Sequence, residues 1–220
     1  MNTVVYCYDA YCGWCYGFSP VIRQLAEDFS QDVFFEVLSG GMILNKKPVS
    51  IAYSAAYIRA AYKTVEEYTG IRFGRDYLWH INHPDQSDWF PDSEKPAIAL
   101  CIFKELHPNL QVPFAADLQF ALHYEGRDLC DDEAYRSLLG KYQMDATAFY
   151  EKLHSPLYRK LAYDEFDLMK KLGISGYPTV LYQESDIRFH LLSRGFTKYD
   201  VLKSRLDAVL ETVKGSSGHK

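Results

Sequence analysis

The chain has 220 residues, of which 48% are hydrophobic, enough for one domain with a full core or for one domain that carries an insertion. Its formal net charge is −5 and no basic run of five or more residues occurs, so a nucleic-acid partner is not expected. No secretion signal is recognisable and no apolar run could span a bilayer, so we expect a cytoplasmic protein that does not bind membranes.

The first part of the chain alternates between strand and helix. Residues 3–9 form a β-branched and aromatic run, residues 17–29 carry apolar side chains at helical spacing, and residues 32–41 form a second strand-like run that ends in two glycines. This order predicts a parallel β-α-β unit with a right-handed connection.

The middle of the chain is predominantly helical in its pattern. Helices are predicted there by helical spacing, by Asp at N-cap positions, or by a Pro start with a Gly end. The predicted helical segments are 49–70, 94–106, 112–126, 131–142, 145–155 and 156–173. Residues 71–93 are expected to form an irregular, aromatic-rich loop.

Strands return near the end of the chain. Residues 177–183 and 187–193 predict a hairpin, and residues 197–213 predict a closing amphipathic helix. The whole order, β-α-β … β-β-α, indicates an α/β, thioredoxin-like fold with a large all-helical insertion. The boundaries that we predict are residues 1–44 and 156–213 for the thioredoxin-like domain, 45–155 for the helical insertion and 214–220 for a flexible tail.

Two of the five cysteines, Cys12 and Cys15, stand between the first strand and the first helix. At a helix N-terminus, unpaired N–H groups and the helix dipole stabilise a thiolate, and C-x-x-C motifs are known for lowered thiol pKa values. Cys15 would lie one turn further on, facing Cys12, so the two could form a small disulfide ring. We therefore expect a redox-active pair, with Cys12 as the exposed nucleophile and Cys15 as the buried resolving thiol.

A metal site and a pair of inert thiols are the two alternatives to a redox-active pair. A structural zinc site requires about four ligands, but Cys101 and Cys130 stand alone within helical patterns, so no metal is expected. Two inert buried thiols are disfavoured by the position of the pair between a strand and a helix. The remaining cysteines are expected to be structural.

Several residues around the pair are candidates for substrate binding. Gly13 permits a tight turn into the helix, and Trp14 would line a substrate surface or shield the sulfurs. A second motif, Gly-Tyr-Pro-Thr, provides Tyr177, Pro178 and Thr179 at the start of a late strand, where a cis proline would be useful. In this layout the loop faces the cysteines, and the Tyr177 backbone would hydrogen-bond an extended substrate.

Glu36 in the second predicted strand is a candidate proton acceptor for Cys15, because a buried carboxylate beside that thiol could act as a general base. The alternative, a strand residue that faces solvent, is favoured by ordinary burial statistics.

Four segments together, CGWCYGFSP, DSEKPAIAL, HYEGRDLCDDEAY and KKLGISGYPTVLY, resemble the DsbA-like thioredoxin-domain family, and within it the cytoplasmic FrnE-like branch of protein-disulfide isomerases. The resemblance extends from about residue 3 to residue 212. It implies a protein-disulfide oxidoreductase or isomerase with a redox-active Cys12–Cys15 pair, a cis-Pro178 loop and no cofactor beyond that disulfide. Its substrates would be thiol or disulfide proteins or small molecules, with glutathione as a candidate co-substrate.

The chain departs from this pattern at two places. Residues 8–11, Tyr-Asp-Ala-Tyr, replace a more usual Asp-Pro sequence, and Tyr177 stands where a smaller or β-branched residue is common. The alternative function is that of a glutathione-dependent isomerase or transferase on the same scaffold, similar to 2-hydroxychromene-carboxylate isomerases or kappa-class transferases. Those enzymes typically have a single Ser at the nucleophile position. The two cysteines of this chain therefore count against the alternative function. The sequence leaves the redox direction open, and it leaves open whether the protein is a monomer or a homodimer.

Overall fold

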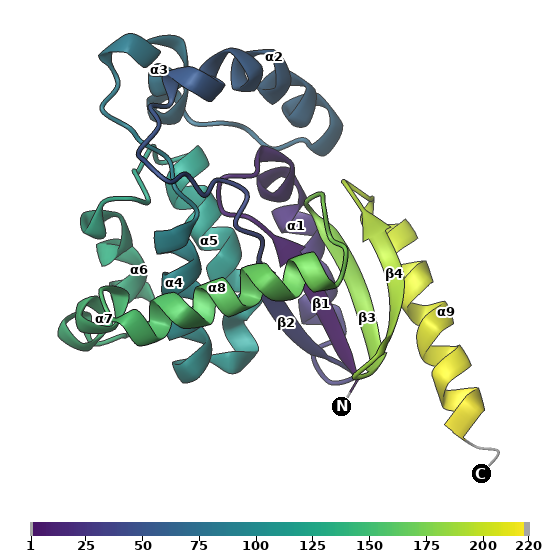
Figure 1. Ribbon diagram of the computed structural model, residues 1–220. Coiled ribbons are helices and arrows are strands. Elements are labelled where there is room, and N and C mark those ends of the chain that lie inside the picture. The colour runs from purple at the N-terminus through teal and green to yellow at the C-terminus, as the bar shows by residue number, and fades with distance from the viewer. Residues whose placement is uncertain (1, 218–220) are drawn as a thin grey trace.

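The computed structural model describes residues 2–217, apart from the side chains of residues 214, 216 and 217 (Figure 1). Its strands are β1 (Thr3–Tyr8), β2 (Phe34–Ser39), β3 (Thr179–Ser185) and β4 (Arg188–Arg194). Its helices are α1 (Gly13–Asp28), α2 (Ala52–Thr69), α3 (Arg75–Asn82), α4 (Glu94–Leu106), α5 (Gln111–His123), α6 (Arg136–Lys141), α7 (Ala146–Leu153), α8 (Pro156–Lys171) and α9 (Tyr199–Ser217). None of these helices combines the length and the hydropathy needed to cross a bilayer.

The strands form one mixed sheet in the order β2-β1-β3-β4. β1 pairs in parallel with β2 and antiparallel with β3, and β3 pairs antiparallel with β4. β1 is central and almost completely buried, as its unbroken apolar and aromatic sequence predicts for a strand covered on both faces. The thioredoxin-like arrangement expected from the sequence is thereby confirmed.

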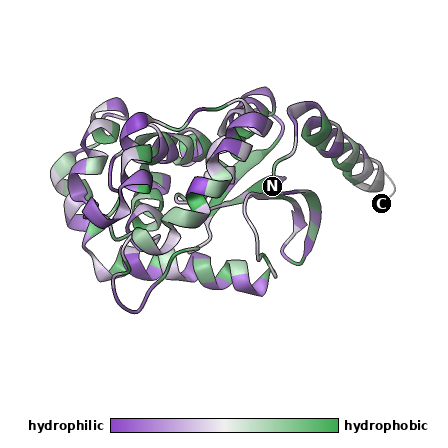
Figure 2. Cartoon of the chain, turned by 90° about the horizontal axis from the view of Figure 1, so that it is seen from above, coloured by the Kyte–Doolittle hydropathy of each residue, from purple (hydrophilic) through white to green (hydrophobic). Residues whose placement is uncertain are grey.

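Alternate residues of β1 contact different layers of helices. Val4 and Tyr6 belong to the large core shared with α1 and α9, whereas Val5 and Cys7 pack with Met169 of α8. Figure 1 shows α8 crossing one face of the sheet and α9 standing beside β4. In Figure 2 the helices alternate between hydrophobic and hydrophilic stretches along their length. The period of two along the strand therefore separates the two cores.

The helices between β2 and α8 extend the core on the side of β2. Phe103 of α4 stacks on Phe114 of α5, with ring centroids 3.9 Å apart. Helices α2 and α3 lie above the N-terminal end of α1 (Figure 1). The inserted helices therefore lie beside the N-terminal end of α1, where the two cysteines are located.

Two predicted segments differ from the structure. Residues 71–93, expected to be irregular, contain α3, which buries Tyr77 and Ile81 one helical turn apart. A helix of eight residues between Gly and Pro has only about two turns, too few for helical spacing to be recognised in the sequence. At the other end, α9 continues through Ser217, four residues past its predicted end, and residues 218–220 of the predicted tail lie outside the described residues.

Candidate active site

The β1–α1 connection places the two cysteines on the first turn of α1. Cys12 is the N-cap residue, with extended backbone, and its N–H donates to the Asp9 carbonyl at 3.1 Å. The Cys15 N–H donates to Cys12 Sγ at 3.4 Å, so the Cys12 sulfur takes the capping position that a serine or aspartate oxygen usually occupies. A sulfur in this position is oriented to benefit from the helix dipole when it is ionised.

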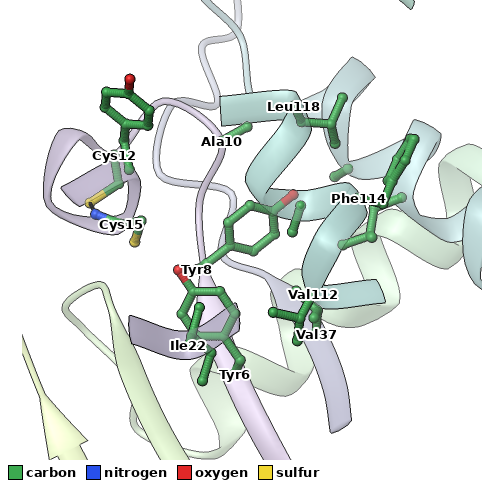
Figure 3. Packing of buried hydrophobic residues seen from close by; sticks show 14 of the residues in the cluster. Tyr6, Tyr8, Ala10, Cys12, Cys15, Ile22, Val37, Val112, Phe114 and Leu118 are labelled. Carbon is green, nitrogen blue, oxygen red and sulfur yellow. Dashed lines mark hydrogen bonds between the residues drawn. The ribbon is translucent and has the colours of Figure 1, made fainter. Parts of the chain in front are cut away.

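The two thiols differ in their surroundings, although less than the sequence predicted. Cys15 is fully buried, while Cys12 is also largely covered, with 7% of its surface exposed, rather than openly exposed. Burial raises the pKa of the Cys15 thiol, and the neighbouring Cys12 raises it further. Figure 3 shows Cys15 directed toward the core tyrosines of β1. The buried thiol is thus held in its protonated form while the pair is reduced.

Asp9, which sequence reasoning did not single out, organises the loop before the pair. Its buried carboxylate accepts hydrogen bonds from the Tyr11 N–H and the Ser93 hydroxyl, both at 3.0 Å, and from the Met42 N–H at 2.7 Å. Burial raises its pKa, and these donors act in the opposite direction. The available signal was an acidic residue placed directly after a buried strand and just before the cysteines.

The second motif approaches the pair from the start of β3. The Tyr177–Pro178 peptide bond is cis, and Cys12 Sγ donates to the Tyr177 carbonyl at 3.6 Å. Thr179, directly after the proline, is buried, and its hydroxyl donates to the Gly176 carbonyl at 2.8 Å. Segments about 165 residues apart in the sequence thus meet at one sulfur.

The Tyr177 side chain is seated against the end of β2. Its hydroxyl donates to the Gly40 carbonyl at 3.0 Å, and a Cβ atom at Gly40 would lie 2.1 Å from Tyr177 Cζ. Only a residue without a side chain fits there. Burial and the neighbouring acidic groups raise the pKa of Tyr177 to about 12.

Gly13 and Trp14 contact the inserted helices. A Cβ atom at Gly13 would lie 3.3 Å from Phe73 Cζ, so Gly13 allows the ring to approach the helix turn closely. The half-buried Trp14 ring meets Tyr68 of α2 edge to face, with centroids 6.1 Å apart. The helical insertion therefore provides an aromatic wall beside the pair, and sequence reasoning did not assign Phe73 or Tyr68 to it.

Glu36 lies elsewhere. It accepts hydrogen bonds from Lys104 Nζ at 2.9 Å and from Gln111 Nε2 at 3.2 Å. It points to the same face of β2 as Leu38, which packs beneath α8, whereas Cys15 belongs to the core on the other face. The structure does not bring Glu36 to Cys15, so it does not support the candidate role of Glu36 as proton acceptor.

A C-x-x-C pair at the start of a helix, opposite a cis proline that precedes a strand, is characteristic of thioredoxin-like folds that exchange disulfides. The family model of the DsbA-like thioredoxin domain matches residues 3–207, and the chain belongs to this family. No protein with a curated description matches the sequence.

Solved structures share the fold over nearly the whole chain. A candidate protein disulfide isomerase from Nitrosomonas europaea is 22% identical, with a TM-score of 0.83 over 96% of this chain and 98% of that chain. The cytosolic disulfide reductase DsbM from Pseudomonas aeruginosa is 28% identical, with a TM-score of 0.72 over 96% and 99%, and has also been solved with GSH. A 2-hydroxychromene-2-carboxylate isomerase, 12% identical, has a TM-score of 0.63 over 99% of each chain.

Proposed function

We propose that this protein is a thiol-disulfide oxidoreductase of the cytoplasm that reduces disulfides through Cys12 and Cys15. The observation that carries the proposal is the position of the Cys12 sulfur, which accepts the Cys15 N–H and contacts the Tyr177 carbonyl beside the cis proline. The reducing direction and the location are inferred from the similarity to the cytosolic reductase DsbM.

The reaction would proceed in two displacements. The Cys12 thiolate attacks one sulfur of a substrate disulfide, a Cys12–substrate S–S bond forms, and the first substrate thiolate leaves and takes up a proton. Cys15 then loses its proton and attacks Cys12 Sγ, and the second substrate thiolate leaves and is protonated. Two electrons pass from the cysteine pair to the substrate, and the protein is left with a Cys12–Cys15 disulfide.

The proposed substrate contacts are those around the pair. The backbone of Tyr177 beside Pro178 would hydrogen-bond an extended peptide or the peptide-like backbone of glutathione, with Thr179 fixing the loop. Gly13 and Trp14 would form the side of the groove that faces the inserted helices. Glutathione is proposed as a co-substrate because the related reductase was solved with GSH.

Trapping of the mixed disulfide tests the proposal. The reduced C15S variant, treated with glutathione disulfide, should accumulate one glutathione on Cys12 and should not turn over, because the resolving thiol is absent. The C12S variant should form no such adduct. The C130S variant removes a thiol that is neither in the pair nor fully buried, and it should behave as the wild type. Turnover of C15S at the wild-type rate would contradict the proposal and favour the glutathione-dependent isomerase or transferase.

A further inference from the structure

A buried tyrosine hydroxyl lies beside the cysteine pair. Tyr6, on the central strand β1, is 1% exposed, and its hydroxyl has no nitrogen or oxygen partner among the described residues; the one side-chain partner within its reach is the Cys15 sulfur. Figure 3 shows the hydroxyl end of this side chain pointing toward Cys15. A thiol sulfur is a weak acceptor that leaves a buried hydroxyl poorly satisfied, so a stronger acceptor that arises in another state of the site would account for the retention of this hydroxyl.

The Tyr6 ring is held in place by its neighbours. Its centroid lies 5.6 Å from that of Tyr8 and 5.9 Å from that of Phe18 on α1. Because the sheet and the helix fix the ring on both sides, the hydroxyl oxygen stays beside the cysteine pair and only its O–H bond can rotate.

The electrostatic surroundings make this hydroxyl a donor rather than a base. Burial raises the pKa of Tyr6, and among charged neighbours Cys15 raises it most, followed by Cys12. The phenol therefore keeps its proton, and a negative charge on Cys15 strengthens any hydrogen bond that the phenol donates.

We propose that Tyr6 is a further catalytic residue of this site: its hydroxyl donates a hydrogen bond to the Cys15 sulfur while that sulfur carries negative charge. The proposal rests on the thiol-disulfide exchange proposed above and concerns its second displacement. Cys15 gives its proton to solvent, its sulfur bonds to Cys12 Sγ, and the bond between Cys12 and the substrate breaks. The electron pair of that bond leaves with the substrate sulfur, which takes a proton from solvent, and Tyr6 keeps its own proton throughout.

Several other groups act on the charge of Cys15, and the test has to separate Tyr6 from them. The titratable groups that face Cys15 are Cys12 on α1, Tyr6 and Tyr8 on β1, Asp9 in the following loop, and Tyr177 beside the cis proline. The Y6F substitution removes one hydroxyl and leaves the others in place. Because the lost hydroxyl has at most a weak thiol partner in the reduced protein, Y6F should unfold at the same or a higher denaturant concentration than the wild type.

A matched control is Y182F. The Tyr182 hydroxyl is also buried and without a hydrogen bond among the described residues. Burial and Glu184, rather than a cysteine, raise the pKa of Tyr182. Tyr182 lies on β3, directly beside β1. Loss of either hydroxyl should therefore change core packing in a similar way, while only Y6F should affect Cys15.

The first measurement is a pH titration of Cys15 in the C12S background, in which the Cβ chemical shift of Cys15 reports its ionisation. Adding Y6F should move the midpoint upward by about one pH unit, as expected for the loss of a hydrogen bond to a charged acceptor, and adding Y182F should leave it in place. An unchanged midpoint with Y6F would overturn the proposal.

The second measurement is single-turnover reduction of glutathione disulfide with both cysteines present. Y6F should slow release of the second glutathione about tenfold at neutral pH and should let the Cys12 adduct accumulate, whereas Y182F should not. If Y6F still resolves the adduct at the wild-type rate, Tyr6 has no catalytic role, although the exchange itself stands. If the wild type exchanges no disulfide, this proposal and the proposed function both fail.

Discussion

Acidification should destabilise the protein through His123 in particular. This residue of α5 is fully buried and stacks on Tyr16, with ring centroids 5.0 Å apart, while Phe73 and Tyr77 pack around it. Its Nδ1–H donates to the Gln119 carbonyl at 3.1 Å, and hydrogen bonding to the backbone favours the charged ring but is outweighed by burial. An imidazolium is poorly solvated in this aromatic surrounding, so burial lowers the pKa of His123 from 6.5 to about 4.

The size and sign of the effect follow from the difference in protonation between the two states. Between pH 6.5 and about 4 the unfolded chain binds a proton at His123 that the folded protein does not, so stability falls as the pH is lowered through this window. At 1.36 kcal/mol for each pKa unit, the contribution lost by pH 4 is about 3 kcal/mol. That is a large fraction of the stability of an ordinary domain.

The H123F variant isolates this contribution, because the ring is kept and the titration is removed. The free energy of unfolding is measured with urea under reducing conditions at pH 7.5 and at pH 4. Between these pH values we expect it to fall by about 3 kcal/mol less in H123F than in the wild type. The H83Q variant removes a surface histidine and should follow the wild type. Equal losses in H123F and the wild type would refute the reasoning.

Two further substitutions test the packing around the site and the network on the far face of the sheet. G40A should push the Tyr177 ring from its seat, lower the free energy of unfolding by about 1–3 kcal/mol and raise KM for a disulfide substrate; G140A, where a Cβ meets open space on a helix, should be neutral or stabilising. A substrate KM unchanged in G40A would show that the Tyr177 position is not required. K104M should lower the free energy of unfolding in urea at pH 7.5 by about 3 kcal/mol, because Lys104 bridges two carboxylates that would be left without a cation; a loss below about 1 kcal/mol would contradict this.

The fold and the position of the two cysteines at the start of a helix could be predicted because their signals are local. A strand-like run, two cysteines and a helix start fall within about 30 residues, and the motif at Pro178 lies at the start of an equally clear strand. These patterns depend on periodicity and on the chemistry of helix ends, which neighbouring residues determine.

The surroundings of the pair could not be predicted in the same way. Asp9 acquires its three donors from residues up to 84 positions away, and Tyr6 faces Cys15 only because β1 passes beneath α1. The partners of Glu36 could not be predicted, because the strand alone does not say which face of the sheet a residue occupies once both faces are covered. The helix α3 was missed because its stability comes from burying Tyr77 and Ile81 against other segments.

The central claim is that Cys12 and Cys15 interconvert between two thiols and one disulfide. Equilibration in glutathione buffers, followed by alkylation and mass counting, measures this directly. We expect one two-electron transition in which two of the five cysteines, Cys12 and Cys15, lose their reactivity together, with a potential nearer to that of thioredoxin, about −270 mV, than to about −120 mV. An alkylation count that stays the same across the whole range of buffers would contradict the account.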